Sequence, residues 1–187
     1  MGDAASPAPS GLIHDRGMIH GESIQYLAFL LTQRNIMATS EDVNFNEPHP
    51  PKENAIEAFK VVEKAIKDEI LASRRRWDGH EPRMWEAAKE LSNNELIGFD
   101  VSNDLVLVSS SPVSYGTIIL GKIRIPALQG GHIHVRLSIH DPPNRGTSDI
   151  TFHSIWTDEG PTDPDTGKHA YYRAIQSLDT PLTFFHE

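Results

Sequence analysis

The chain has 187 residues, of which 38% are hydrophobic and 23% are charged, a size and composition typical of one soluble globular domain. With 17 basic and 26 acidic residues the formal net charge is −9, so we expect no open nucleic-acid surface, which would need a net basic face. The absence of cysteine excludes disulfides, thiolate nucleophiles and cysteine-ligated metal centres. Any bound metal would need histidine, carboxylate or tyrosine ligands.

Residues 1–17 are small and proline-rich, and they predict a disordered tail. Their start, MGDAASPAPSG, lacks the basic and apolar regions of a signal peptide, although MGDAAS also fits the loose pattern for N-myristoylation at Gly2. The longest apolar run, around YLAFLL, is far too short to cross a bilayer. We therefore expect a soluble, cytoplasmic protein without a membrane partner, with a single domain over residues 18–187.

The first part of that domain, residues 18–95, is expected to be helical. Apolar residues recur at helical spacing over residues 22–37. A stronger helix is predicted to begin at Asn54, the N-cap of a capping-box variant with Glu57, and to end at the stretch SRRRW. A third helix is expected over residues 83–94, RMWEAAKELSNN.

The remainder of the chain, residues 96–187, predicts an antiparallel sheet. The expected elements are strands over 95–101 and 105–110 around a tight turn, then strands over 116–126, 132–140 and 149–157, a short helix over 168–178 and a last strand over 182–186. The strands on either side of DPPNRGTS should form a hairpin. The expected fold class is α+β, with N-terminal helices packed on one face of a C-terminal antiparallel sheet that is open, strongly curved or a half-barrel.

The predicted strand HIHVRLSIH, residues 132–140, carries the clearest functional pattern. Side chains alternate between the two faces of a strand, so one face receives His132, His134, Arg136, Ser138 and His140. The other face receives the aliphatic residues Ile133, Val135, Leu137 and Ile139, which should pack against the helices. The polar set contains no carboxylate, and the neighbouring strands would add Lys122, Arg124 and His153. The sequence therefore predicts a cationic, titratable surface on an otherwise acidic protein.

A metal site is one hypothesis for this surface. The H-x-H pair of His132 and His134 projects both imidazoles the same way, as in several metalloenzymes built on β-sheets. His140, His153 or a carboxylate would have to complete the ligand set, and the ion would be a divalent or iron-type metal. The shorter stretch GGHIHV is similar to the iron-binding G-x-x-H-x-H stretch of intradiol ring-cleaving dioxygenases, but that family's two tyrosine ligands have no clear counterparts here, so we assign no family.

Acid–base chemistry without a metal is the second hypothesis. A histidine would move a proton near neutral pH while Arg136 orients an anionic substrate, as in an isomerase, lyase or cyclase. The catalytic candidates are then His132, His134, Arg136, His140 and His153. The alternatives are a non-catalytic binding or interaction module that uses the same cationic face, and a sheet face that only meets water. Under the functional hypotheses the partner is a small polar or anionic molecule.

Overall fold

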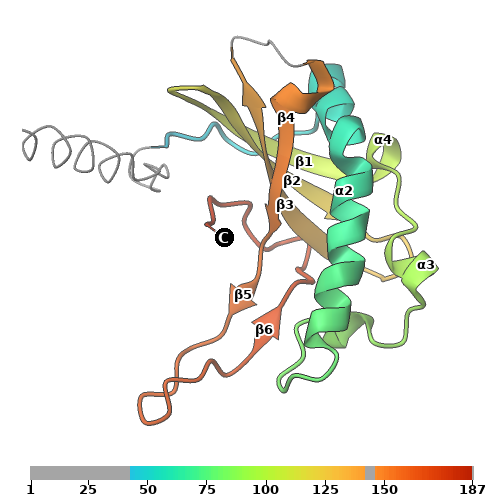
Figure 1. Ribbon diagram of the computed structural model, residues 1–187, viewed down its shortest axis with the longest axis vertical. Helices are drawn as coiled ribbons and strands as arrows, with labels where there is room; N and C mark the ends of the chain where they lie inside the picture. Colours follow the sequence, from blue (N-terminus) through green and yellow to red (C-terminus); the bar gives the residue numbers. More distant parts are fainter. Residues whose placement is uncertain (1–42, 142–145, 187) are drawn as a thin grey trace, which may run out of the picture. The chain divides into compact units, whose positions relative to one another are not determined.

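The protein is described by a computed structural model over residues 43–141 and 146–186. These residues all belong to one compact unit that spans residues 38–187. The predicted tail and the predicted helix over residues 22–37 lie outside the described residues. The expected α+β arrangement is confirmed, because one long helix packs against a four-stranded antiparallel sheet (Figure 1).

The long helix α2 runs from Glu53 to Trp77. It buries residues three or four positions apart on the side that faces the sheet, among them Phe59, Val62, Ile66 and Ile70. The predicted N-cap at Asn54 is wrong, since the N–H groups of Ala55 and Ile56 already bond to the carbonyl of Lys52. Lys52 is therefore the N-cap, and it makes no side-chain capping bond.

The sheet is a meander in which each strand pairs with the next in the chain. Its strands are β1 (Leu105–Val113), β2 (Gly116–Arg124), β3 (His132–His140) and β4 (Ile150–Ile155). The predicted hairpin of β3 and β4 is confirmed, and so are the predicted bounds of β3. Strands β1 and β4 form the two edges, and the described strands do not close into a barrel.

Two expectations between α2 and β1 are wrong. The predicted third helix is reduced to a 3-10 turn, η1 (Glu86–Ala88), because the capping box of Ser92 and Glu95 starts a separate short helix, α3 (Asn93–Leu96). The predicted strand over 95–101 is also absent, since Asp100 caps another short helix, α4 (Val101–Asp104), by accepting a hydrogen bond from the N–H of Ser102.

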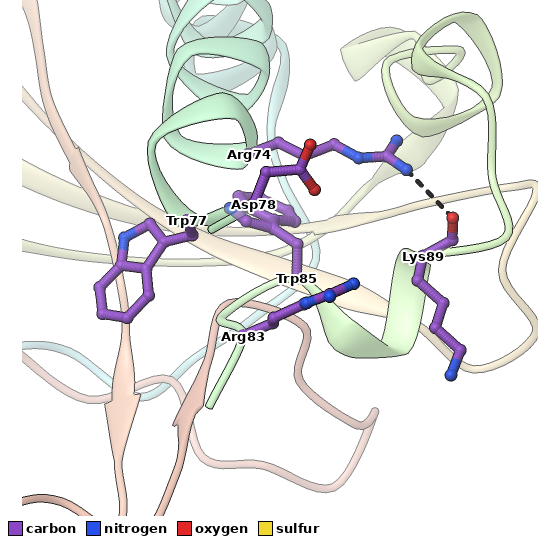
Figure 2. Close-up of a pocket in the computed structure, with 6 residues that line it drawn as sticks. All are labelled: Arg74, Trp77, Asp78, Arg83, Trp85 and Lys89. Carbon is purple, nitrogen blue, oxygen red and sulfur yellow. Dashed lines mark hydrogen bonds between the residues drawn. The ribbon is translucent and has the colours of Figure 1, made fainter. Parts of the chain in front are cut away.

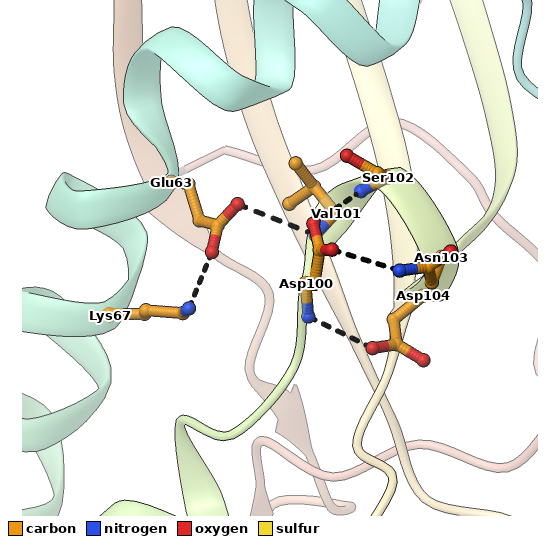
Figure 3. A network of polar contacts seen from close by, with 7 residues as sticks. All are labelled: Glu63, Lys67, Asp100, Val101, Ser102, Asn103 and Asp104. Atoms are coloured by element: carbon orange, nitrogen blue, oxygen red, sulfur yellow. Dashed lines mark hydrogen bonds and ion pairs between the residues drawn. The ribbon is translucent and has the colours of Figure 1, made fainter.

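A polar network ties α4 to the long helix (Figure 3). Glu63 of α2 pairs with Lys67 and accepts a hydrogen bond from the N–H of Val101 at 3.4 Å. The buried carboxylate of Asp104 accepts a bond from the N–H of Asp100, and its other oxygen binds Arg124 of β2 at 2.7 Å. These contacts fix the start of the sheet against the helix that covers it.

The predicted elements after β4 are wrong as well. Residues 168–178 contain no helix, because Tyr172–Arg173 (β6) pairs with Asp158–Glu159 (β5) as a small second sheet. The segment 182–186 is not a strand. A second 3-10 turn, η2 (Gly146–Asp149), precedes β4. The residues after β6 instead form an irregular segment with a turn at residues 178–179; residues 176–186 are called the C-terminal segment below.

The two faces of the sheet have different covers. Ile133, Val135 and Leu137 pack with α2 in the main hydrophobic core. On the opposite face, Leu120 of β2 packs with Leu182 and Phe185 of the C-terminal segment in a smaller cluster. The polar residues of β3 therefore lie beneath a segment that comes about 40–50 residues later in the chain.

Candidate functional site

The predicted separation of faces on β3 is confirmed. The aliphatic residues belong to the helix-side core, and the polar residues face the C-terminal segment. The register of β2 and β3 places Lys122 opposite His134 and Arg124 opposite His132, as the order of the chain predicts. The positive groups expected on this surface are thus brought together on neighbouring strands.

The cover over this polar face was not expected. His132, His134, Arg136 and Lys122 are only 4%, 0%, 7% and 1% exposed. A backbone bridge between His132 and Gln176 starts the cover, with bonds of 2.9 and 2.7 Å. The expectation of a sheet face that meets water is therefore wrong for this half of β3.

Two buried cations hold the C-terminal segment by its backbone. The ammonium of Lys122 donates to the carbonyl oxygens of Leu178 and Thr180, both at 2.6 Å. The guanidinium of Arg136 donates to the carbonyl oxygen of Phe185 at 2.9 Å. Burial lowers the pKa of Lys122, while the nearby charge of Asp179 partly opposes that shift. These cations anchor the chain to itself.

His134 lies at the centre of the covered face. Its ring stacks on Trp156, with centroids 5.2 Å apart and an interplanar angle of 13°. Among the described residues neither ring nitrogen has a hydrogen-bond partner. Burial, reinforced by the positive charge of Lys122 and by His132, lowers the pKa of His134 to about 3. The imidazole is therefore neutral at every pH near 7.

His132 is held in a similar way at the start of β3. Its Nδ1 lies 3.0 Å from the carbonyl oxygen of Gly130. Burial is the main cause that lowers the pKa of His132, with further contributions from Lys122 and Arg124, while the bond to Gly130 opposes the shift. A general acid or base works best with a pKa near the working pH, so His134, with its pKa at about 3, does not suit that role in this state.

His153 is the predicted residue that stays accessible. The pairing of β3 and β4 slips by one residue between Arg136 and Leu137, which leaves His153 as the extra residue of a β-bulge. Its Nε2 lies 2.8 Å from the hydroxyl of Ser138 on the polar face. Partial burial and the nearby charge of Arg136 lower the pKa of His153.

His140 does not join the other histidines. It lies at the opposite end of the nine-residue strand β3 from His132, about 26 Å away at the rise of a β-strand. It is half-buried and pairs with Gly116 of β2. The five predicted site residues thus divide into a buried group (His132, His134 and Arg136), an accessible His153 and a remote His140.

The metal hypothesis gains no support from this arrangement. Within residues 43–141 and 146–186, no group of three or more His, Asp or Glu side chains is placed to hold a metal ion. His132 and His134 lie on one face, as predicted, but the described chain brings no third ligand of these types to them. Their role as metal ligands stays a prediction.

A groove with a volume of about 580 Å³ lies between the C-terminal half of α2 and β4. Three half-buried aromatic residues line it: Trp77 of α2, Phe152 of β4 and Tyr172 of β6. Its polar lining includes His153 and two side chains of α2, Glu69 and Arg76, which form an ion pair. We call this feature the α2–β4 groove.

Most residues of this groove could not be identified from the sequence, because they come from four separate elements, α2, β4, β5 and β6, and form no local motif. One signal was present: Glu69, Ser73 and the adjacent pair Arg76 and Trp77 follow one another at intervals of three or four residues, so they share a side of α2 next to its buried stripe. Of the five predicted site residues, His153 lines the groove, and His132, His134, Arg136 and His140 do not.

A smaller pocket of about 80 Å³ lies at the end of α2, where Trp77, Trp85 and three cations meet (Figure 2). Arg74 is already bonded to the carbonyl oxygen of Lys89, and Lys89 pairs with Glu86. Asp78 also lines the pocket, and the last turn of a helix carries a partial negative charge. The cations at this end complement the helix dipole, which is a structural role.

Comparisons with protein-family models, with curated proteins and with solved structures find no match. The helices within the described part of the chain are all too short or too polar to span a bilayer.

Proposed function

We propose that the protein is a binding protein whose ligand occupies the α2–β4 groove. The observation that carries this proposal is the groove itself, which has the volume of a ligand site and combines half-buried aromatic walls with convergent polar groups. Trp77 and Tyr172 contact each other with ring centroids 4.7 Å apart, which makes a continuous apolar wall. A ligand with an apolar body would cover these rings.

The polar groups of the groove favour a ligand that is amphipathic. Arg76 and Glu69 are more than one-third exposed in their ion pair, so a ligand can exchange bonds with either at small cost. Glu159 contributes a second carboxylate, and His153 lines the β4 side while its ring lies beside Ser138 of the polar face. This mixture of signs supports a polar, not strictly anionic, partner.

Binding fits the buried histidines better than the catalytic hypothesis does. With its pKa at about 3, His134 stays neutral near pH 7, and burial also lowers the pKa of His132. Lys122 and Arg136 are engaged with backbone carbonyls of the C-terminal segment. The polar face in this state acts as an internal anchor, and the groove is the accessible surface.

The test is a fragment screen by NMR on the full chain. We expect small aromatic fragments with a polar substituent to shift the amide resonances of groove residues, with Trp77 and Phe152 among the most affected. Trp77→Ala should weaken binding by about tenfold, since it removes a large buried contact area. Val61→Ala is the matched control, because Val61 is an exposed apolar residue on the same helix, 43% exposed, outside the groove.

Fragments that shift resonances elsewhere but leave the groove unaffected would contradict the proposal. Equal binding by the Trp77→Ala and Val61→Ala variants would contradict it as well. Circular dichroism and a thermal melt on each variant establish that the altered protein is folded.

A second candidate, an enzyme, is favoured by one contact. The hydroxyl of Ser138 lies 2.8 Å from Nε2 of His153, which is the spacing of a nucleophile and its general base. In acyl transfer, the Ser138 proton would pass to His153 as Oγ attacks a carbonyl carbon, and the nearby positive charge of Arg136 would favour the oxyanion. His153 would then return the proton to the leaving group as the bond between that group and the carbonyl carbon breaks, which leaves the acyl group on Ser138.

A fluorophosphonate probe tests this candidate directly. If Ser138 is nucleophilic, the probe should label the wild-type protein at Ser138, and labelling should fall by about a hundredfold in a His153→Gln variant, the usual size of a general-base effect. Ser110→Ala is the control, because Ser110 is another half-buried serine on the sheet. Absence of labelling at Ser138 would rule out this role.

A further inference from the structure

We propose that the ligand of the α2–β4 groove is an extended peptide segment that adds to the sheet as a new strand beside β4. This inference rests on the proposed function, since it specifies what the groove binds. It is carried by the position of the groove directly beside a sheet edge with which no residue of 43–141 or 146–186 pairs.

The two edges of the sheet differ. At the β1 edge, the chain covers its own strand with residues 46–49. The N–H of His49 donates to the carbonyl oxygen of Val108, and the N–H of Val108 donates to the carbonyl oxygen of His49, both at 2.9 Å. At the β4 edge, no described residue does this, because β4 pairs with β3 alone and its remaining backbone groups form no backbone bond with residues 43–141 or 146–186.

The orientation of the β4 backbone follows from one bond. The N–H of Trp156 donates to His134 of β3 at 2.9 Å, so the backbone groups of Trp156 point toward β3. Because backbone groups alternate along a strand, those of Ile155 point away from β3. Ile155 is only 4% exposed, so a peptide reaches these groups when the side chains that cover them move aside. Ile155 also lines the groove, so a peptide bonded there lies against it.

Helix α2 runs alongside β4 and forms the opposite wall (Figure 1). A peptide between a helix and an edge strand gains affinity from main-chain bonds and specificity from pockets for alternate side chains. Alternate residues of the added strand would enter the groove against Trp77, Phe152 and Tyr172. The expected partner is therefore an extended segment with apolar or aromatic residues at every second position.

A second copy of this chain is a poorer occupant. The strand β4 has only six residues, about 20 Å, and the bulge at His153 distorts it. Bulges and short edge strands are features that hinder the pairing of whole sheets edge to edge. A short linear peptide needs only a few regular positions, and Phe152 and Ile155 flank the bulge.

The experiment uses the full chain and a library of random linear peptides displayed on phage. Peptides selected on the wild-type protein and lost on the Trp77→Ala variant are synthesised and measured by isothermal titration calorimetry. Each position of the best peptide is then N-methylated in turn. We expect binding to fall about two- to tenfold per lost main-chain bond, and to do so at alternate positions, with the intervening positions much less sensitive.

The period-two pattern is the decisive readout, because it reports main-chain pairing and leaves the protein unaltered. In parallel, amide hydrogen exchange at Ile155 should slow when the peptide is bound, and the backbone bond of His49 at the other edge provides the internal reference.

The other outcomes separate this inference from the function beneath it. If aromatic fragments bind the groove but no peptide shows the alternating pattern, the peptide inference is overturned and the binding function stands. If neither fragments nor peptides bind, both fail. Concentration-dependent self-association that slows exchange at Ile155 would replace the peptide with a second copy.

Discussion

At the scale of single residues, the strand pattern predicts on which face of the sheet His134 lies, but it does not predict that His134 is buried. Alternation along HIHVRLSIH placed His134 on the polar face, and the register with Lys122 agrees with that prediction. Its burial depends on residues 176–186, which are distant in sequence and carry no local signal for covering a sheet. A histidine with an ordinary pKa was therefore expected where the pKa is about 3.

Because the imidazole of His134 is buried, we expect the free energy of unfolding to decrease in mild acid. The unfolded chain takes up a proton at His134 below its ordinary pKa of 6.5, whereas the native protein does so only near 3, so unfolding binds protons across that window. At pH 5 this residue should cost about 2 kcal/mol of the stability present above pH 6.5.

The measurement is urea unfolding at pH 7 and pH 5 for the wild-type protein and a His134→Phe variant, which keeps an aromatic ring against Trp156. The variant should lose less stability between the two pH values. The lowered pKa values of His132 and His153 act in both proteins and cancel in the comparison. An equal loss in both proteins would show that His134 is accessible to protons in the native state.

At the scale of elements, the strongly periodic segments were predictable and the short ones were not. Helix α2 and strands β2, β3 and β4 follow their apolar patterns, because each buries a full face. RMWEAAKELSNN has helical composition, yet Trp85 is drawn into the core, where its indole N–H donates to Ser73 at 3.0 Å. That tertiary contact and the capping box at Ser92 override local propensity.

The contact between α2 and the sheet depends on one small residue. A Cβ atom at Gly121 of β2 would lie 2.2 Å from the ring of Phe59, which is fully buried. Gly121→Ala should therefore destabilise the protein by about 1–3 kcal/mol, the usual cost of an overpacked core. Chemical denaturation measures the loss.

Two further variants check the cause of that loss. A Gly79→Ala change is the matched control, because no atom lies within 4 Å of a Cβ at that position. Combining Gly121→Ala with Phe59→Leu should recover part of the stability, since the smaller side chain leaves room for the methyl group. Independent, additive losses in the double variant would argue against the steric origin.

At the scale of the whole molecule, a helix covers one face of the sheet, and the C-terminal segment covers the part of the other face that holds Lys122, His132, His134 and Arg136. The sequence predicts the first cover through helical periodicity. The sequence does not predict that the C-terminal segment covers the other face. Lys122 and Arg136 donate hydrogen bonds to its backbone carbonyl oxygens, and every residue type has such a carbonyl, so the contact leaves no sequence pattern. The same difficulty applies to the α2–β4 groove, whose walls come from separate elements.

We expect the protein to be less stable when Lys122, which holds the C-terminal segment on the sheet, is replaced. Lys122→Met retains the length of the side chain but removes the donor that binds Leu178 and Thr180. We expect the free energy of unfolding to fall by about 1–3 kcal/mol, because charged hydrogen bonds of this kind are lost while the burial of an ammonium is relieved.

Limited proteolysis supplies the local readout for this variant. Cleavage within residues 176–186 should become faster in Lys122→Met, while cleavage elsewhere follows only the global change in stability. Lys60→Met, at an exposed position on α2, is the control. Unchanged cleavage of the C-terminal segment would mean that the apolar contacts of Leu182 and Phe185 hold it without Lys122.

The anchoring of a late segment by earlier strands also has a consequence for synthesis on the ribosome. Strands β2 and β3 leave the ribosome before residues 176–186 exist, so Lys122 and Arg136 stay hydrated while the helix side of the sheet can already pack. The helix side of the sheet would then pack first, and the polar face would be covered afterwards. Its last step would be the dehydration of two cations as the newly made carbonyls reach them.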